Sequence, residues 1–214
     1  MVLNDKKAEL IGAIIGDGCI RYKPKISQYY VEIVGDPKQE KEYFKHLTEI
    51  FWNELKLKTH IKIRERGLRL KVYSKSFVEY LVYELKMPCN KEKCQNIFIP
   101  EEILQNKKLL KCCIRGIVDT DGSLFLANKG YRKDYPTIEI STTSKRLANQ
   151  LHDKLSQDFR IGFRNYKQAD YNRIHRISIN GDRMVNRWHK EIGFSNKRII
   201  DRYQKLKESG PTGI

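Results

Sequence analysis

Hydrophobic and polar positions along the chain follow two patterns, and each pattern predicts a different kind of element. Apolar residues recur at helical spacing in four segments, at 9–16, 43–51, 110–118 and 147–159. Apolar and polar residues alternate in three others, at 30–34, 61–72 and 137–140. Spacing of three or four positions gathers side chains on one face of a helix, whereas alternation gathers them on one face of a strand. The chain is therefore predicted to combine helices with half-buried antiparallel strands in an α+β fold.

These patterns occur twice in the same order. Each half begins with a helical run that ends in an Asp-Gly pair, first at Asp17 and again at Asp121, about half the chain later. Two strand-like runs, an amphipathic helix, a basic hairpin and a closing helix complete each copy, which predicts a duplicated αββαββα fold. Pro100 is typical of a helix start and Asn106 of a helix cap. We expect a first repeat over residues 1–105, a second over 106–207 and a disordered tail over 208–214.

The charge of the chain indicates the type of partner. Lysine and arginine number 42 against 26 aspartates and glutamates, which gives a formal net charge of +16. In the hairpin expected at 60–75, aliphatic residues alternate with basic ones, so one face of two neighbouring strands would carry a row of like charges. Like charges opposed across strands destabilise a hairpin, and a phosphate backbone over that face would relieve the repulsion. Nucleic acid is favoured over a merely solvated basic face.

Composition excludes several classes of protein. With 40% hydrophobic and 32% charged residues and no long apolar run, the chain is expected to be neither disordered nor a membrane protein. Charged residues near the start argue against a secretory signal peptide. A cytoplasmic location is expected, with association with the nucleoid in a prokaryote. Five cysteines at irregular spacing indicate reduced thiols and no zinc site, namely Cys19, Cys89, Cys94, Cys112 and Cys113.

Small residues in the two helical runs predict that the runs pack against each other. Gly12 and Gly16 lie four positions apart on one helix face, and Gly116 and Thr120 repeat that spacing in the second half. Small side chains allow two helices to approach more closely than the usual 8–10 Å between axes. The aspartate that ends each run would then meet the other across a pseudo-twofold axis. The glycines that follow, Gly18 and Gly122, are expected to end the helices in the left-handed conformation.

Such a meeting of Asp17 and Asp121 is electrostatically unfavourable by itself. Both carboxylates would sit at helix C-termini, where the backbone adds negative potential, and the expected ligand is an anion. Divalent cations would relieve these conflicts, because Mg²⁺ is typically held by one or two carboxylates together with phosphate oxygens and water. A single aspartate beside glycine is more often a turn residue. Two of them at matching places in a duplicated basic protein favour metal-dependent chemistry on a phosphodiester.

The two runs also resemble a known family. Leu10-Ile-Gly-Ala-Ile-Ile-Gly-Asp-Gly18 and Ile114-Arg-Gly-Ile-Val-Asp-Thr-Asp-Gly122 closely resemble the two copies of the LAGLIDADG motif. Over essentially its whole length, the chain is similar to single-chain, two-repeat homing endonucleases of the archaeal intron-encoded or free-standing type. The resemblance implies a monomer whose two four-stranded antiparallel sheets form a DNA-binding saddle. It also implies cleavage of both strands across the minor groove of a long asymmetric site, which leaves 3′ overhangs.

The resemblance assigns metal-binding roles at the motif ends. Asp17 and Asp121 would be the catalytic, metal-binding acids, with the carbonyl groups of Gly16 and Thr120 completing the metal shell. Mg²⁺ is the implied cofactor, with Mn²⁺ as a substitute and with Ca²⁺ supporting binding without cleavage.

Three further residues are implied in the catalytic set. Lys71 and Arg176 would be the basic residues near the centre of the site, one in each repeat. Thr142 would orient water at the end of the second strand of its repeat. Its counterpart Gly35 departs from the Gln or Asn often found there.

Contacts to DNA are expected from the outward residues of the strands, because Arg and Lys can pair with guanine, Gln with adenine and Glu with cytosine. In the first repeat these residues are Arg21, Lys23, Lys25, Gln28, Tyr30, Glu32, Lys62, Arg64, Arg66, Arg69 and Lys71. In the second repeat they are Arg132, Lys133, Tyr135, Thr137, Glu139, Arg164, Lys167, Arg173 and Arg176. The two sets differ, which predicts an asymmetric target.

Two other functions stay open at the level of sequence. Some members of the family assist the splicing of the intron that encodes them, so an RNA maturase that binds its own intron RNA is one alternative. A DNA-binding regulator without catalytic activity is the other. Cleavage of a duplex that depends on Mg²⁺ distinguishes the endonuclease from both.

Overall fold

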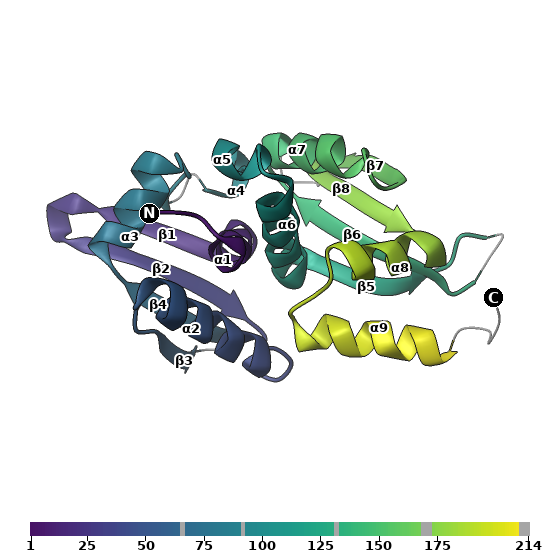
Figure 1. Cartoon of the computed structure of the whole chain (residues 1–214), viewed down its shortest axis with the longest axis horizontal. Coiled ribbons are helices and arrows are strands. Elements are labelled where there is room, and N and C mark those ends of the chain that lie inside the picture. The colour runs from purple at the N-terminus through teal and green to yellow at the C-terminus, as the bar shows by residue number, and fades with distance from the viewer. Residues whose placement is uncertain (65–66, 91–92, 131–132, 168–172, 210–214) are drawn as a thin grey trace.

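The computed structural model describes residues 1–64, 67–90, 93–130, 133–167 and 173–209. Over these residues each half of the chain forms one four-stranded sheet, and helices cover one face of it (Figure 1). The α+β class and the duplicated antiparallel architecture predicted from the sequence are confirmed. Arg66 and Arg132, two of the expected DNA contacts, lie outside the described residues.

The first repeat follows the predicted order. Its elements are α1 (Asp5–Ile15), β1 (Gly18–Lys23), the 3-10 turn η1 (Pro24–Ile26), β2 (Gln28–Gly35), α2 (Lys41–Leu55), β3 (His60–Arg64), β4 (Gly67–Tyr73), α3 (Lys75–Glu79) and the π-helical turn η2 (Tyr80–Glu84). Two short helices, α4 (Lys93–Asn96) and α5 (Glu101–Leu104), connect it to the second repeat. Lys25 lies in η1, so the expectation that it projects from a strand is wrong.

The second repeat contains the same succession of elements. They are α6 (Lys107–Asp121), β5 (Gly122–Ala127), β6 (Tyr135–Thr142), α7 (Lys145–Leu155), β7 (Ile161–Lys167), β8 (Arg173–Asn180) and α8 (Asp182–Glu191). Asn106 caps α6 as predicted, because its side chain accepts hydrogen bonds from the backbone N–H groups of Lys108 and Leu109. A helix that was not predicted, α9 (Lys197–Ser209), follows and includes the first two residues of the expected tail. Residues 210–214 lie outside the described residues.

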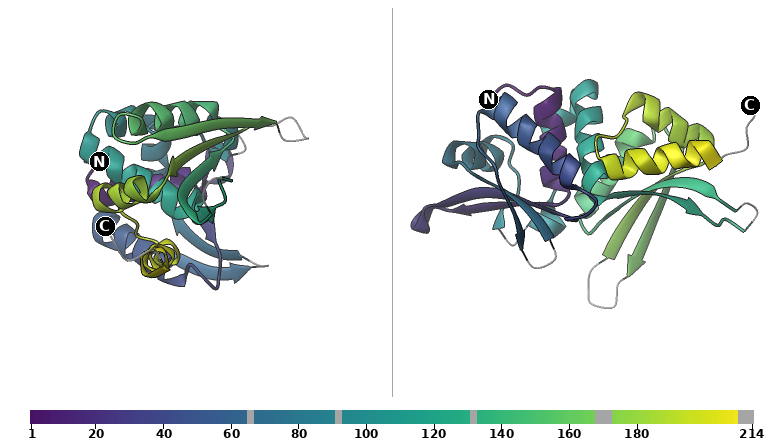
Figure 2. Two further views of the ribbon diagram at one scale, coloured as in Figure 1. Left: turned by 90° about the vertical axis from the view of Figure 1, so that its right-hand side faces the viewer. Right: turned by 90° about the horizontal axis from the view of Figure 1, so that it is seen from below.

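The two sheets are equivalent in topology and register. Their strand orders are β1-β2-β4-β3 and β5-β6-β8-β7, and every neighbouring pair is antiparallel. Gly18 pairs with Ile33 in the first sheet, and Gly122 pairs with Ile140 in the second. The helices form one layer and the sheets another, and the helix-free faces of both sheets turn to the same side (Figure 2). We call these two surfaces the sheet faces.

Each repeat has an apolar core between its sheet and its helices. Ile33, Phe51 and Leu70 are fully buried in the first core, and Ile177 and Trp188 are fully buried in the second. This burial confirms the alternation read from the sequence, since the charged neighbours of these strand residues point to the sheet faces. Within the described part of the chain, every helix is too short or too polar to cross a lipid bilayer.

Helices α1 and α6 join the repeats through direct backbone contact. A Cβ on Gly12 would lie 2.0 Å from the carbonyl oxygen of Cys113, and a Cβ on Gly116 would lie 2.1 Å from that of Glu9. Real Cβ atoms do not approach other atoms so closely, so glycine is required at both positions. The close packing predicted from the spacing of small residues is confirmed.

The glycines that end the motifs have a different role from the expected one. Gly122 has an extended backbone with φ −86° and ψ 158°, and Gly18 is not among the residues with positive φ. The left-handed conformation expected at both positions is therefore wrong. Each glycine starts a strand that turns back against its own helix, so that a Cβ would lie 2.6 Å from the carbonyl oxygen of Ile14 or 2.4 Å from that of Val118.

Candidate acidic site and nucleic-acid interface

Asp17 and Asp121 lie at the same end of the paired helices. Asp121 is the last residue of α6, and Asp17 lies in the turn between α1 and β1. The backbone of Gly16 approaches α6 so closely that a Cβ there would lie 2.0 Å from Oγ1 of Thr120 and 3.5 Å from Cγ of Asp121. The hydroxyl of Thr120 itself donates to the carbonyl oxygens of Gly116 and Ile117 within α6, both at 3.0 Å. The two motif ends therefore meet where the repeats join.

A hollow of about 280 Å³ opens beside this meeting point. Three consecutive hydroxyl residues at the end of β6 and in the turn after it line one side of the hollow, and Asp121 lines another. The full lining is Ile15, Gly16, Ile97, Asp121, Ser141, Thr142, Thr143 and Ile174. The structure thus places Thr142, the expected water-orienting residue, next to Asp121.

The first repeat has no matching hydroxyl. The register places Gly35 opposite Leu68 and Thr142 opposite His175, so Gly35 and Thr142 are counterparts, as expected. A Cβ on Gly35 would lie 2.6 Å from Oε2 of Glu40 and 2.6 Å from the ring of Phe44. A side chain there would have to displace both of these groups, and the two sides of the acidic site differ in their side chains.

Buried polar residues tie the two motif helices together. Glu9 of α1 has no exposed surface and accepts a hydrogen bond from Arg115 of α6 at 2.7 Å. The side chain of His46 lies 2.7 Å from the other carboxylate oxygen of Glu9. Burial alone would raise the pKa of Glu9, but the hydrogen bond with His46 and the charge of Arg115 outweigh it and lower the pKa to about 2. Glu9 is therefore an anion held between the repeats.

A second buried acid lies in the motif itself, two positions before Asp121. Asp119 has no exposed surface, and burial raises its pKa to about 7. Its Oδ2 accepts a hydrogen bond from the backbone N–H of Ser195 at 2.8 Å. This contact attaches the loop before α9 to the end of α6.

Asn196 completes the attachment and was not singled out from the sequence. Its fully buried side-chain amide donates to the carbonyl oxygen of Asp119 at 2.8 Å and to Oε1 of Glu40 at 2.9 Å. Its oxygen accepts from the backbone N–H of Arg198 at 3.0 Å. One asparagine therefore connects α6, the start of α2 and the start of α9. The Ser-Asn pair before a helical run was the sequence signal, because both residues favour helix caps.

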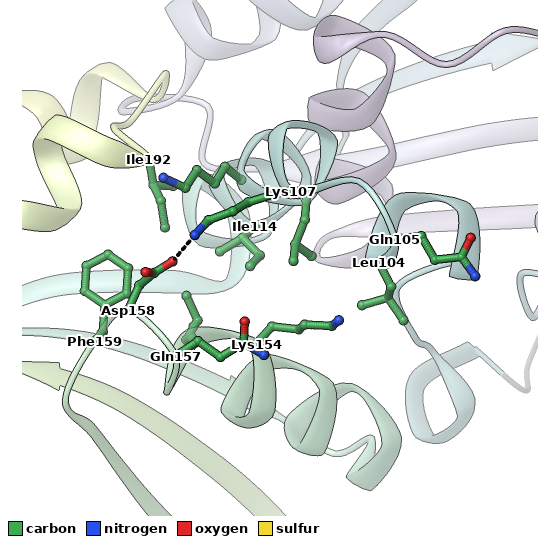
Figure 3. Close-up of a pocket in the computed structure, with 12 residues that line it drawn as sticks. Leu104, Gln105, Lys107, Ile114, Lys154, Gln157, Asp158, Phe159 and Ile192 are labelled. Carbon is green, nitrogen blue, oxygen red and sulfur yellow. Dashed lines mark ion pairs between the residues drawn. The ribbon is translucent and has the colours of Figure 1, made fainter.

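A separate hollow of about 210 Å³ lies at the opposite end of α6 from Asp121 (Figure 3). Its wall includes the apolar side chains of Ile114, Phe159 and Ile192, and Lys107 pairs with Asp158 at 3.0 Å beside it. Because it is distant along the helix from the paired aspartates, this hollow is not part of the acidic site.

The sheet face of the first repeat carries most of its expected contact residues. The strand register places Cys19, Arg21, Lys23, Gln28, Tyr30, Glu32, Val34, His60, Lys62, Arg64, Arg69, Lys71 and Tyr73 on one side of the sheet. A hollow of about 220 Å³ is formed there by Glu32, His60, Lys62, Arg64, Arg69, Lys71 and Tyr73. His60 and Tyr73 were missed from the sequence, although the same alternation extended by one step at each end of the hairpin would have included them.

In the second repeat the structure supports some expected contacts and corrects others. Glu139, Arg164 and Arg176 lie on the sheet face. Thr137 is 1% exposed, and its hydroxyl donates to Oδ1 of Asn180 at 3.1 Å, so it is closed to a ligand. Arg173 and Arg176 lie on opposite faces of β8. Arg173 shares the face of Ile177, which is the side covered by helices.

The remaining expected contacts lie near the ends of strands. Tyr135 begins β6, and Lys133 is exposed in the bend before it. The backbone of Lys167, the last residue of β7, pairs with that of Arg173, and its side chain lies outside the described part of the structure. Tyr166, whose ring centre lies 4.8 Å from the guanidinium carbon of Arg176, was missed from the sequence.

The register also changes the pairing of the two central basic residues. Leu70 is opposite Ile33, and Ile177 is opposite the equivalent Ile140, so Arg69 is the counterpart of Arg176. Lys71 corresponds instead to Ser178, and the pairing of Lys71 with Arg176 expected from the sequence is off by two residues. The side-chain contacts agree, because Arg69 lies 3.7 Å from Glu32 and Arg176 lies 3.6 Å from Glu139.

Comparison with known proteins supports this architecture. Residues 110–193 match the family model of the LAGLIDADG-like domain. Mesophilic variants of the homing endonuclease I-DmoI have a TM-score of 0.64 and 21% identity, over 88% of this chain and 95% of theirs. I-DmoI in complex with DNA and Mn gives 0.64 and 21%, over 89% of this chain and 97% of that one.

The N-terminal LAGLIDADG domain of DUF199/WhiA is also similar, with a TM-score of 0.54 and 15% identity over 90% of this chain and 84% of that one. By sequence, no curated protein matches the chain. These structural similarities concern the fold, and the matched domain lies in the second half. Residues 110–193 therefore form a LAGLIDADG-like domain, and the chain as a whole shares the fold of the homing endonuclease I-DmoI.

Proposed function

We propose that the protein is a metal-dependent endonuclease that cuts both strands of a specific double-stranded DNA site. The meeting of Gly16, Thr120 and Asp121 beside a basic first sheet face and a polar second one that carries Arg164 and Arg176 is the observation that carries this proposal. It brings an acidic centre to the place where a duplex lying along both faces would pass. The structure of I-DmoI with DNA and Mn supports the same use of the fold.

The groups at the motif ends fit a hard divalent cation. The carboxylates of Asp17 and Asp121 and the carbonyls of Gly16 and Thr120 are oxygen donors, which Mg²⁺ and Ca²⁺ prefer. Within the described residues, no group of three or more His, Cys, Asp or Glu side chains could hold a metal ion. DNA phosphate oxygens and water would therefore supply the remaining ligands. Mg²⁺ is the proposed ion, Mn²⁺ a substitute, and Ca²⁺ an ion that supports binding alone.

The protein side chains around the cation would bind phosphate and orient water. A bound divalent cation would activate water and stabilise the leaving 3′ oxygen. Arg69 and Arg176 occupy equivalent positions on the two sheet faces, where each would contact the phosphate of one strand. Thr142 lines the hollow next to Asp121 and would orient water in the second repeat. Lys71, 3.2 Å from Glu32 and 4.2 Å from the ring of Tyr30, would bind DNA in the first repeat.

Differences between the sheet faces support an asymmetric target. The first face presents Lys62, Arg64 and Lys71, whereas Ser178 replaces the lysine in the second repeat. Base edges are read by side chains on strands in the major groove, while phosphate contacts mainly set position. We propose a long DNA site read by one monomer, with cleavage across the minor groove and 3′ overhangs.

The test begins with a pool of random duplexes from which the protein selects binders in Ca²⁺. The selected duplexes are then incubated with the protein in Mg²⁺ or Mn²⁺, and the products are analysed on denaturing gels. Cleavage of both strands in Mg²⁺, lost in EDTA, supports the endonuclease. Specific binding in Ca²⁺ without a cut in either Mg²⁺ or Mn²⁺ contradicts it. Binding to intron RNA without duplex cleavage would favour the maturase instead.

A further inference from the structure

A groove of about 460 Å³ lies in the helical layer, between the start of α2 and one side of α9. Figure 1 shows the start of α9 beside the loop that leads into α2, and Figure 2 shows both helices in the layer opposite to the sheet faces. Its lining is Lys38, Gln39, Lys41, Glu42, Lys197, Arg198, Asp201, Arg202 and Lys205. We call it the helix-side groove.

Positive charge dominates this groove. Six of the nine lining residues are lysine or arginine, and two are acidic. Lys197 pairs with Asp201 at 2.8 Å, and Arg198 approaches Glu40 at 3.4 Å. In the described part of the chain, Lys38, Lys41 and Arg202 make no ion pair within 4.0 Å. The groove therefore holds more positive charge than its own carboxylates neutralise.

The cations come from both repeats and face one another. Arg198, Arg202 and Lys205 are spaced by four and three positions, so they lie along one side of α9 in a row of about 10 Å. Lys38 and Lys41 approach from the loop before α2 and from its first residue. Like charges in a hollow repel each other and concentrate a field that attracts polyanions.

The chemistry of the lining selects the class of ligand. All nine lining residues are polar or charged, so the groove lacks the aromatic anchors of protein interfaces and the apolar side chains of membrane-binding surfaces. It also lacks an aromatic ring on which a base could stack. A row of cations without base-reading groups suits a phosphodiester backbone, which is bound largely without regard to sequence.

We propose that the helix-side groove is a second nucleic-acid site, which binds the phosphodiester backbone independently of the sheet faces. The ligand is the backbone of a single-stranded segment, which carries one negative charge per phosphate in RNA and DNA alike, and the two single-stranded probes distinguish these sources. The proposal does not depend on cleavage, and it holds for a catalytically inactive DNA-binding protein as well.

The test compares three charge-reversed double variants of the full chain. Lys41→Glu with Arg202→Glu alters the groove, and Lys62→Glu with Arg64→Glu alters a sheet face. Lys154→Glu with Lys190→Glu alters one half-buried and one exposed helical lysine outside both sites and so controls for net charge. Each variant is titrated by fluorescence anisotropy against labelled single-stranded RNA, single-stranded DNA and duplex DNA, after circular dichroism has shown an unchanged melting temperature.

We expect the groove variant to lose about tenfold in affinity for the RNA or the single-stranded DNA probe, with a salt slope lower by about two units. The control variant should stay within about twofold of wild type, and the sheet-face variant should lose duplex binding while retaining the groove ligand. Protein saturated with unlabelled duplex should still bind that ligand. The single-stranded probe that binds more tightly shows whether the groove prefers RNA or DNA. Equal losses in the groove and control variants, or loss of all probes in the sheet-face variant, would overturn the proposal.

Discussion

Glu9 of α1 and Arg115 of α6 form an ion pair 2.7 Å long across the junction of the two repeats. The carboxylate is fully buried, and His46 contacts its other oxygen. Buried ion pairs contribute little net stability over an apolar pair, but removing one partner is costly because the other charge stays buried. The pair therefore fixes the register of the two motif helices, which in turn sets the position of Asp17 relative to Asp121.

Acid should destabilise the protein through Glu9. Its pKa in the folded state is about 2, below the usual 4.5, so its contribution is present above pH 4.5 and is lost as the pH falls towards 2. Glu9→Gln should lower the free energy of unfolding by about 3 kcal/mol at pH 7. Below pH 4.5 the free energy of unfolding of the variant should fall less steeply with pH than that of the wild type. Urea unfolding between pH 7 and pH 2 measures both effects. If the free energy of unfolding of the variant falls as steeply in acid as that of the wild type, the loss of stability in acid comes from other carboxylates.

Contact between the motif helices should tolerate no methyl group. Gly116→Ala would place a Cβ 2.1 Å from the carbonyl oxygen of Glu9, so the helices must separate, and we expect a loss of about 3 kcal/mol or more. Gly130→Ala is the control, because its Cβ meets nothing within 4 Å and only its positive φ carries a cost of about 1 kcal/mol. Thermal unfolding of both variants compares them. Equal losses would show that close packing at Gly116 is unimportant.

Patterns with a fixed period were readable from the sequence, whereas features set by tertiary contact were not. Alternation placed Glu32 and Glu139 on the sheet faces, because side-chain direction follows directly from the period of a strand. It could not match Lys71 or Arg69 with Arg176, since residues two apart share a face and only strand pairing distinguishes them. Burial of Thr137 depends on its neighbour Asn180 in another strand, which no local pattern reveals.

The acidic site shows the same division. The meeting of the motif ends was predictable because small residues four positions apart recur in both helices. The conformation of Gly122 was not, because the reason for glycine is the nearby carbonyl of Val118 rather than a helix cap. Asn196 was missed because its partners, Asp119 and Glu40, are distant in sequence.

Asn196 should position the end of α6 without contacting DNA. Asn196→Ala leaves the carbonyl of Asp119 and the carboxylate of Glu40 without this donor, and we expect a loss of about 2 kcal/mol in stability. If the proposed cleavage occurs, the rate of the chemical step should fall while the affinity for duplex in Ca²⁺ stays within about threefold. Single-turnover kinetics and binding titrations separate the two. Parallel losses in rate and affinity would indicate a general structural role.

Equivalent positions of Arg69 and Arg176 predict matched effects on the two DNA strands. Arg69→Ala should slow the cut of one strand and Arg176→Ala that of the other, each by about tenfold or more. In each variant the reacting phosphate loses the positive charge of a nearby arginine. Lys71→Ala should weaken binding and slow neither strand selectively. Duplexes labelled on one strand at a time provide the measurement. A strand-selective effect of Lys71→Ala would restore the pairing expected from the sequence.

Replacement of the paired acids should separate binding from cleavage. Asp17→Asn and Asp121→Asn each remove a negative charge at the motif ends, so the proposed cation loses a ligand while the repulsion of DNA phosphates decreases. We expect cleavage to fall by at least about a hundredfold and duplex affinity, measured without divalent ions, to stay equal or increase. Asp134→Asn, at an exposed position before β6, is a control for the change in charge. Loss of duplex binding in either motif variant, with Asp134→Asn unaffected, would show that the acids serve the fold and would argue against the metal-dependent mechanism.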